Sequence, residues 1–319
     1  MPTDLKKPHA LNYQEAGKWV LRGVAQVMFQ PHAGTGILFV VGLALGSPLV
    51  AVGALLGSAL GTGLAWLLNY DREEIKNGIY GFNSSLVGIG LLTLLQPAPM
   101  TWVLVVLGSL LASPATYYMR QYLPFPTYTT PFILVTWLAL VVGHGTIGHK
   151  LDAKPPALPE HELNFFDSIL AGEAEVMLGA SSLTGILFVV GIALSDWRHA
   201  LIAVLGSAIG TWQARTHLDL EGNIALGIYG YNATLAAMAI WLSKSSLSGV
   251  LLSAIISVPL VEYFPKASGL PALTAPFVVA TWMVLAFDGL DPLIGRNQFA
   301  QPSGQVEVPI PEPEETPTT

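Results

Sequence analysis

Residues 36–45 read GILFVVGLAL, and residues 185–194 read GILFVVGIAL. The two stretches agree at nine of ten positions and lie 149 positions apart. An apolar segment that occurs twice at this distance points to the duplication of a larger unit. The same offset should therefore align the flanking sequence as well.

The flanking sequence does align. Three further pairs match: GVAQVMF (23–29) with GEAEVML (172–178), GIYGFN (78–83) with GIYGYN (227–232) and, after a four-residue deletion that changes the offset to 145, PTYTTPF (126–132) with PALTAPF (271–277). A period of this length indicates two half-domains and not a solenoid. We expect a first half-repeat at 1–148, a linker loop at 149–166, a second half-repeat at 167–300 and a disordered acidic, Pro-rich tail at 301–319.

The composition is that of a membrane protein. Of 319 residues, 52% are hydrophobic and 11% are charged, and the mean hydropathy is +0.56. Soluble domains carry about 25% charged residues, so this chain has too few charges to cover a water-facing surface. A net charge of −7 argues against a nucleic-acid partner, which needs a basic face. The chain has no cysteine, and its sequence calls for no cofactor or metal.

Each half contains a short amphipathic segment followed by five apolar segments. The short segments lie near 22–31 and 171–180, and the apolar ones near 34–47, 49–69, 78–95, 100–119 and 127–145, then 183–195, 198–213, 226–242, 247–262 and 271–288. The runs are apolar throughout and lack the period-two alternation of barrel strands. The sequence predicts an all-α polytopic membrane protein with five transmembrane helices and one half-membrane helix in each half.

An odd number of crossings makes the second half enter the membrane from the opposite side, which gives two inverted halves. With the N-terminus inside, the inner side holds ten Lys and Arg residues and the outer side four, as expected when positive loops stay in the cytoplasm. If the segment at 34–47 re-enters without crossing, the halves are parallel and the tally becomes nine against five. We expect inverted halves in a plasma (inner) membrane, with both termini cytoplasmic and a central pore between the halves.

Polar residues at membrane depth are costly and usually functional, and two pairs recur at equivalent positions. Gln26 and Glu175 lie in the short segments, where they face a neutral ligand rich in N–H groups or tie the half-helix to its neighbours. Thr129 and Thr274 precede Pro at a predicted helix start, so we expect them to cap helices that begin at depth or at the interface. Glu173 is expected to face water at a helix start.

A third set consists of paired aromatic and leucine side chains: Phe29 with Leu178, Phe82 with Tyr231, and Leu86 with Leu235. Positions 82 and 86 share one helical face. Taken alone, this set is more typical of a packed core than of a pore wall. Asn83 and Asn232 are expected to support the helices through hydrogen bonds.

The doubled P-x-x-T-x-P-F element at 126–132 and 271–277, the duplicated halves and the Gln/Glu half-helices resemble the urea transporter family over roughly residues 15–295. The resemblance implies inverted halves, a homotrimer in the lipid bilayer, and a passive urea path through each protomer. It implies that the path is lined at one end by Gln26, Phe29 and Phe82, at the other by Glu175, Leu178 and Tyr231, and between them by Thr129, Thr274, Leu86 and Leu235. Tyr231 departs from the Phe expected there.

Other functions remain open at this point. The pore is also suited to ammonia or small amides, and Glu175 is suited to carry a proton in coupled urea uptake. An enzyme is not expected, because the chain lacks an HExxH element and has no Ser or Asp dyad that repeats at depth. A nucleotide-driven pump needs a phosphate-binding G-x-x-x-x-G-K-[ST] loop, which is absent from this sequence.

Overall fold

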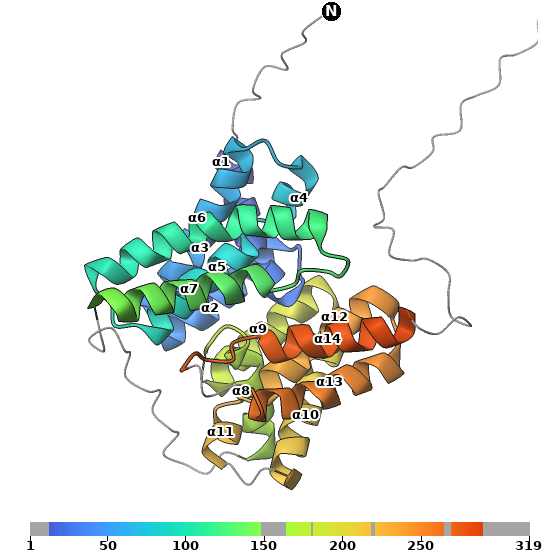
Figure 1. Ribbon diagram of the computed structural model, residues 1–319. Coiled ribbons are helices and arrows are strands. Elements are labelled where there is room, and N and C mark those ends of the chain that lie inside the picture. The colour runs from blue at the N-terminus through green and yellow to red at the C-terminus, as the bar shows by residue number, and fades with distance from the viewer. Residues whose placement is uncertain (1–12, 148–163, 180, 218–220, 265–268, 290–319) are drawn as a thin grey trace, which may run out of the picture.

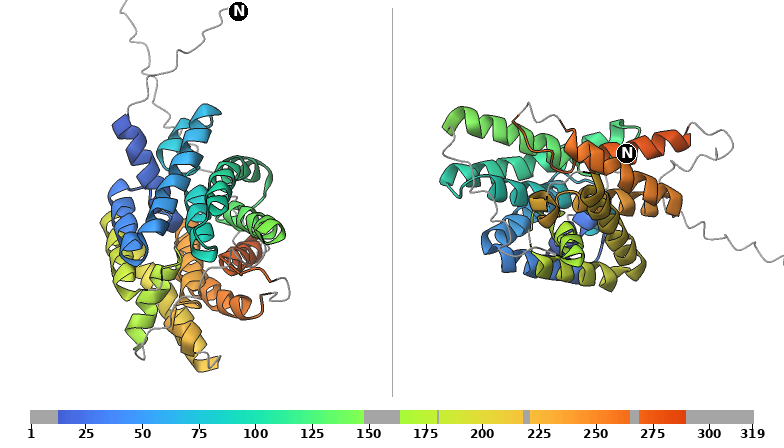
Figure 2. Two further views of the ribbon diagram at one scale, coloured as in Figure 1. Left: turned by 90° about the vertical axis from the view of Figure 1, so that its left-hand side faces the viewer. Right: turned by 90° about the horizontal axis from the view of Figure 1, so that it is seen from below.

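The computed structural model describes residues 13–147, 164–179, 181–217, 221–264 and 269–289. These residues form fourteen α-helices and one 3-10 helix, with no β-strand among them. In Figures 1 and 2 the two halves form two adjoining clusters of helices. The predicted tail at 301–319 and most of the predicted linker lie outside the described residues.

The two halves have the same order of α-helices, seven in each among the described residues, and the first half also has a 3-10 helix. The first contains α1 (Tyr13–Ala25), η1 (Gln26–Met28), α2 (Ala33–Gly46), α3 (Pro48–Leu67), α4 (Arg72–Lys76), α5 (Phe82–Leu94), α6 (Pro99–Tyr122) and α7 (Thr130–Ile147). The second contains α8 (Phe165–Glu175), α9 (Ser182–Ser195), α10 (Trp197–His217), α11 (Glu221–Ala225), α12 (Gly230–Lys244), α13 (Leu247–Glu262) and α14 (Ala275–Gly289). Each of the ten predicted apolar segments overlaps a helix, and four of these helices begin three or four residues later than predicted.

The short segments differ from the prediction. The helix predicted from residue 22 begins at Tyr13, and the one predicted from residue 171 begins at Phe165. Both begin earlier because polar residues continue the helix outside the apolar stretch. In α1, for example, Lys18 pairs with Glu15 one turn away at 2.7 Å. The short helices α4 and α11 were not predicted.

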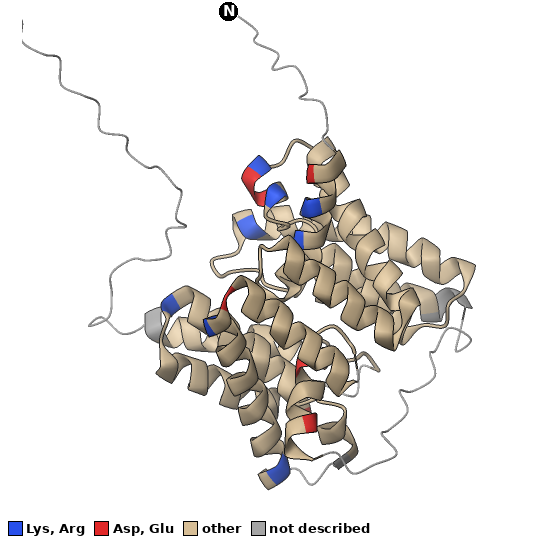
Figure 3. Ribbon diagram, turned by 180° about the vertical axis from the view of Figure 1, so that it is seen from behind, with Lys and Arg blue, Asp and Glu red and all other residues tan. Residues whose placement is uncertain are grey.

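The helices differ in whether they are long enough to span a bilayer. By length and composition, α3 (20 residues) and α6 (24 residues) are able to cross a membrane. The pair formed by α1–η1 and α2 passes the same test as one span, although it is bent by 73°. Most of the other apolar helices among the described residues are shorter, at 10–17 residues. In Figure 3 the charged residues occupy short stretches of the ribbon, and long stretches of helix between them carry no charged residue.

Glycines bring the helix backbones close together within each half. A Cβ atom added to Gly57 on α3 would lie 2.1 Å from the carbonyl oxygen of Ser84 on α5, and one added to Gly210 on α10 would lie 2.3 Å from that of Tyr229, just before α12. Small residues four positions apart allow such close approach. The repeated glycine spacing is therefore a packing device in both halves.

The halves meet each other through equivalent residues of α2 and α9. The Thr35 hydroxyl donates to the Gly191 carbonyl at 2.6 Å, and Thr184, at the equivalent position, donates to the Gly42 carbonyl at 2.9 Å. The Phe39 and Phe188 rings, also equivalent, have centroids 4.6 Å apart. Each of these contacts between α2 and α9 therefore has an equivalent contact made by the other half, as in an isologous interface.

Candidate functional site

The starts of α7 and α14 meet where the two halves join. The Thr129 and Thr274 hydroxyls lie 2.7 Å apart, each on the residue just before its helix, and both side chains are buried. They come from positions 145 apart in the sequence. The pair is therefore a small polar point within an apolar core, made equally by the two halves.

The two threonines do not cap these helices, which corrects the expected capping role. The Asn83 Oδ1 atom accepts the Phe132 backbone N–H at 3.2 Å, and Asn232 Oδ1 accepts that of Phe277 at 2.9 Å. A free N–H of the first helical turn needs an acceptor, and a buried asparagine at the start of α5 or α12, two helices earlier in the chain, supplies it. The supporting role expected of the asparagines is confirmed. The Thr129 hydroxyl is therefore available to bond to the Thr274 hydroxyl.

Two tryptophans tie the segments in front of these helices to the opposite half. Trp137 Nε1 donates to the Pro271 carbonyl at 2.9 Å, and Trp282 Nε1 donates to the Pro126 carbonyl at 2.9 Å. The two bonds are equivalent under the repeat. Each P-x-x-T-x-P-F element is therefore held by the half to which it does not belong.

Four residues of the site share a rare backbone conformation. Phe29 and Leu178 follow the two half-helices with φ of 61° and 57°, and Tyr128 and Leu273 precede the threonines with φ of 44° and 49°. Non-glycine residues with positive φ are uncommon and are held in place only where the surrounding structure demands it. Because all four occur as equivalent pairs, the strained turns belong to the duplicated framework.

Gln26 and Glu175 end their half-helices in different surroundings. Gln26 Nε2 donates to the Asn77 carbonyl at 2.9 Å, so this amide ties the half-helix to the loop before α5. No hydrogen bond or ion pair joins the Glu175 carboxylate to another described residue. Glu175 instead lines a cavity of about 620 Å³. The two equivalent positions thus offer different chemistry.

The cavity includes three of the residues predicted for the Glu175 end of the path. Glu175, Leu178 and Tyr231 all line it, together with Leu270 and Leu273 from the segment before α14. The Tyr231 hydroxyl donates to the Leu273 carbonyl at 2.5 Å. The extra hydroxyl therefore has a backbone partner.

The Gln26 end is aromatic. The Phe29 ring meets the Tyr128 and Phe277 rings edge-on, with centroids 6.2 and 6.3 Å away, and the latter two rings lie 5.2 Å apart. Phe82 is half-buried, whereas Leu86, one turn further along α5, is buried. Tyr128 and Phe277 were missed as site residues, although both belong to the repeated P-x-x-T-x-P-F elements.

Two remaining positions lie inside the protein. Leu235 is fully buried on α12, like its equivalent Leu86 on α5. Glu173 does not face water as expected, because its side chain is fully buried and its Oε1 accepts the Thr234 hydroxyl at 3.0 Å. Among the described residues, no group of three His, Asp or Glu side chains could hold a metal ion.

The sequence pattern of the family described as "Urea transporter" matches residues 17–289. The chain belongs to the urea transporter family. It is 28% identical to Urea transporter 1 of Ovis aries over 327 residues, which cover 95% of this chain and 83% of that protein. It is 28% identical to Urea transporter 1 of Mus musculus over 318 residues, which cover 92% and 82%. Urea transporters are membrane proteins, in keeping with the apolar helices.

In this urea transporter the paired threonines, the strained turns and the half-helix ends lie along the line where the halves meet. The threonines provide hydroxyl groups, which both donate and accept hydrogen bonds. The half-helix ends provide an amide at Gln26 and a carboxyl group at Glu175. The arrangement is suited to binding a small neutral molecule through hydrogen bonds.

Proposed function

We propose that this protein carries urea passively across the plasma (inner) membrane, through a path between the two halves of each protomer. The observation that carries the proposal is the buried Thr129–Thr274 pair, which two equivalent helix starts form at the junction of the halves. Polar groups buried at membrane depth usually mark a substrate path.

The side chains of the proposed path match the chemistry of urea, which is flat, uncharged and has four N–H bonds. Aromatic and aliphatic walls at Phe29, Phe82, Leu86, Leu178, Tyr231 and Leu235 suit its two faces, and oxygen acceptors suit its edges. Gln26 uses its amide nitrogen on Asn77, so its Oε1 atom is the acceptor it offers. A hydrated ion would have to lose its water for the same slot, which is far more costly than for a neutral molecule.

The contacts between α2 and α9 support inverted halves. Thr35, near the start of α2, meets Gly191 near the end of α9, and Thr184, near the start of α9, meets Gly42 near the end of α2. The two helices therefore run in opposite directions and exchange equal contacts. This pattern supports a two-fold axis in the membrane plane, as expected for inverted repeats. The odd number of apolar segments and the distribution of Lys and Arg in the sequence lead us to propose five crossings in each half and both termini in the cytoplasm.

Exposed apolar side chains support burial of the outer surface in lipid and against further copies of the chain. Val103, Leu107 and Leu111 form one such row on α6, with exposed fractions of 46%, 60% and 46%. Rows of this kind are unfavourable in water. We propose a homotrimer in the bilayer, and light scattering of the detergent-solubilised protein would give the number of copies.

The test is stopped-flow urea flux in liposomes that contain the purified protein, compared with Thr129→Val, Thr274→Val and the double variant. Valine keeps the shape and removes the hydroxyl. Each single variant removes one hydroxyl that would bond to urea in the path, so we expect urea flux to fall by about tenfold, the effect of losing one hydrogen bond of about 1.4 kcal/mol. Unchanged flux in the folded double variant would remove the threonines from the path.

Two other permeation modes have distinct outcomes in the same experiment. Equal rates for ammonia or small amides would make the pore a less selective channel. Urea accumulation that follows a proton gradient would make it a coupled transporter, with Glu175 as the residue to examine. Flux that follows only the urea gradient supports the passive channel.

A further inference from the structure

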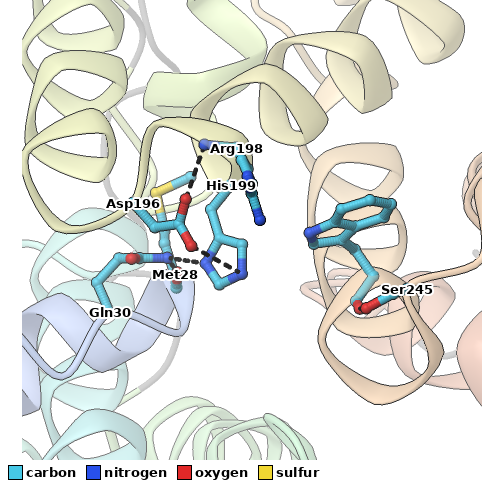
Figure 4. A network of polar contacts seen from close by, with 7 residues as sticks. Met28, Gln30, Asp196, Arg198, His199 and Ser245 are labelled. Atoms are coloured by element: carbon cyan, nitrogen blue, oxygen red, sulfur yellow. Dashed lines mark hydrogen bonds and ion pairs between the residues drawn. The ribbon is translucent and has the colours of Figure 1, made fainter.

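One polar contact joins the two halves without a counterpart. Gln30 is the residue after Phe29, and its side chain is buried. Its Nε2 atom donates to the Met28 carbonyl at 2.8 Å. The same Nε2 atom lies 3.2 Å from Nδ1 of His199, on the first turn of α10 in the other half. Figure 4 shows Gln30 reaching the imidazole ring, with Asp196 close to the ring.

The repeat does not require this contact. The residues equivalent to Gln30 and His199 are Gly179 and Val50, and neither has a polar side chain. The contact therefore exists only at the Gln26 end of the proposed path. It was not predicted, because both residues depart from the repeat and the sequence does not show that they meet.

The geometry fixes the proton on the imidazole ring. The amide nitrogen of Gln30 has only hydrogens to offer, so Nδ1 of His199 must accept. The ring is then neutral with its proton on Nε2, which lies 4.0 Å from the Asp196 carboxylate. A flipped Gln30 amide would turn its oxygen toward the Met28 carbonyl, so the side chain cannot reverse without losing that bond.

We propose that the Gln30–His199 contact is a cross-half latch that positions the turn from Gln26 to Gln30, and with it the Phe29 ring, and that a proton on Nδ1 of His199 opens the latch. This inference rests on the proposed urea path, since Phe29 is one of its walls. His199 is a positioning residue, because it acts on the path through Gln30 and does not touch the permeant.

The sign of the pH effect follows from the donors. Protonation turns Nδ1 into a donor that points at the hydrogens of the Gln30 amide, so the contact is present above the pKa of His199 and lost below it. Among the described residues, the charged group that faces the ring is the Asp196 carboxylate, which also accepts the Arg198 backbone N–H at 2.8 Å. The Arg198 guanidinium lies over the Trp197 ring, 5.6 Å from its centroid.

The experiment measures urea flux in liposomes with the full chain from pH 7.5 down to pH 4.5, because burial lowers the pKa of His199 below its ordinary value. For the wild-type protein we expect flux to fall across this range by about twofold to tenfold, the effect of losing one hydrogen bond. His199→Asn keeps an acceptor near the Nδ1 position and cannot take up a proton, so its flux should stay near the wild-type value at pH 7.5 throughout the range. His199→Val, which copies the other half, should give low flux throughout.

His217→Asn is the matched control, since His217 lies at the opposite end of α10 and bonds to Gln213 and Thr216 of its own helix. This variant should keep the wild-type pH dependence. A wild-type flux that does not change with pH, or a pH dependence that survives in His199→Asn, would overturn the latch.

A second measurement separates the latch from the proposed function. Imidazole ¹⁵N NMR of the solubilised full chain, assigned with His199→Asn, reports the protonation of His199 whether or not urea moves. An unprotonated Nδ1 at pH 7.5 is expected, and a neutral ring with its proton on Nδ1 would contradict the latch. Absence of urea flux in the wild-type protein at every pH in the range would instead reject the proposed function.

Discussion

The Gln26 end and the Glu175 end of the proposed path are built on the same framework and lined differently. In both, an asparagine accepts an N–H of the helix two further along the chain (α7 or α14), a left-handed residue closes the half-helix, and a tryptophan bonds to the other half. The linings then diverge. Phe29 stands at one end and Leu178 at the other, and likewise Tyr128 and Leu273.

The divergence shows which features of the duplicated half are constrained. Backbone turns, caps and glycine contacts are retained because each half needs them to bury its polar groups, which are costly to leave unpaired in lipid. Side chains that face the proposed path can differ between the halves, because they contact the permeant and are not needed to hold the helices together. The aromatic Gln26 end packs ring against ring, whereas the Glu175 end leaves a cavity of about 620 Å³.

The largest expected effect comes from breaking the framework at a glycine. In Gly57→Val the new Cβ would lie 2.1 Å from the Ser84 carbonyl oxygen, and in Gly206→Val it would lie 2.7 Å from that of Ala233. Overpacking costs about 1–3 kcal/mol and more against rigid backbone, so we expect Gly57→Val to lose the folded protein and Gly206→Val to retain more of it. Size-exclusion chromatography in detergent measures both.

Gly63→Val is the control for this pair, because a Cβ at Gly63 meets nothing within 4 Å. It should elute like the wild-type protein. Equal loss of folded protein in Gly63→Val would mean that the damage comes from the exchange itself and not from helix contact.

A smaller effect is expected from the capping asparagines, and it should differ between the halves. Asn83 bonds to Phe132 N and the Tyr128 carbonyl, and also to the Thr116 hydroxyl at 3.0 Å. In the second half the residue equivalent to Thr116 is Val261, which has no hydroxyl. Asn83→Ala should therefore lower the free energy of unfolding more than Asn232→Ala, by about 1 kcal/mol for the extra bond.

Thermal unfolding of the two alanine variants in the same detergent measures this difference. Asn83→Asp and Asn232→Asp keep an oxygen acceptor for the helix N–H and serve as control variants in the same measurement. If Asn232→Ala is the less stable of the two, the third hydrogen bond of Asn83 contributes nothing and the caps are energetically unequal for another reason.

Much of the fold could be predicted from the sequence, because the patterns that indicate helices lie within short stretches of the chain. Long apolar runs and the doubled segments predicted ten of the helices, and the equivalence of Thr129 and Thr274 indicated that they act together. The contact between their hydroxyls agrees with that. Local patterns were sufficient wherever burial alone decides the element.

The rest depends on contacts between distant residues. The sequence placed a cap on Thr129, but the acceptor comes from Asn83 on another helix, 49 positions from the N–H it receives. Glu173 looked like a solvent-facing helix start, yet the earlier beginning of α8 moves it into the core. The Gln30–His199 contact combines two departures from the repeat that no pattern in the sequence links.

The smallest expected effect comes from giving the two ends the same polar group. Glu175→Gln gives the Glu175 end the amide found at Gln26, with one oxygen acceptor retained. If urea passes down its gradient, flux should fall by about twofold, no more than the weakening of one hydrogen bond requires, and equally for inward and outward gradients. Stopped-flow flux at pH 5.5 and 7.5 measures this. Loss of a proton-driven urea accumulation in Glu175→Gln, with downhill flux intact, would instead make the carboxyl group a proton carrier and the two ends functionally distinct.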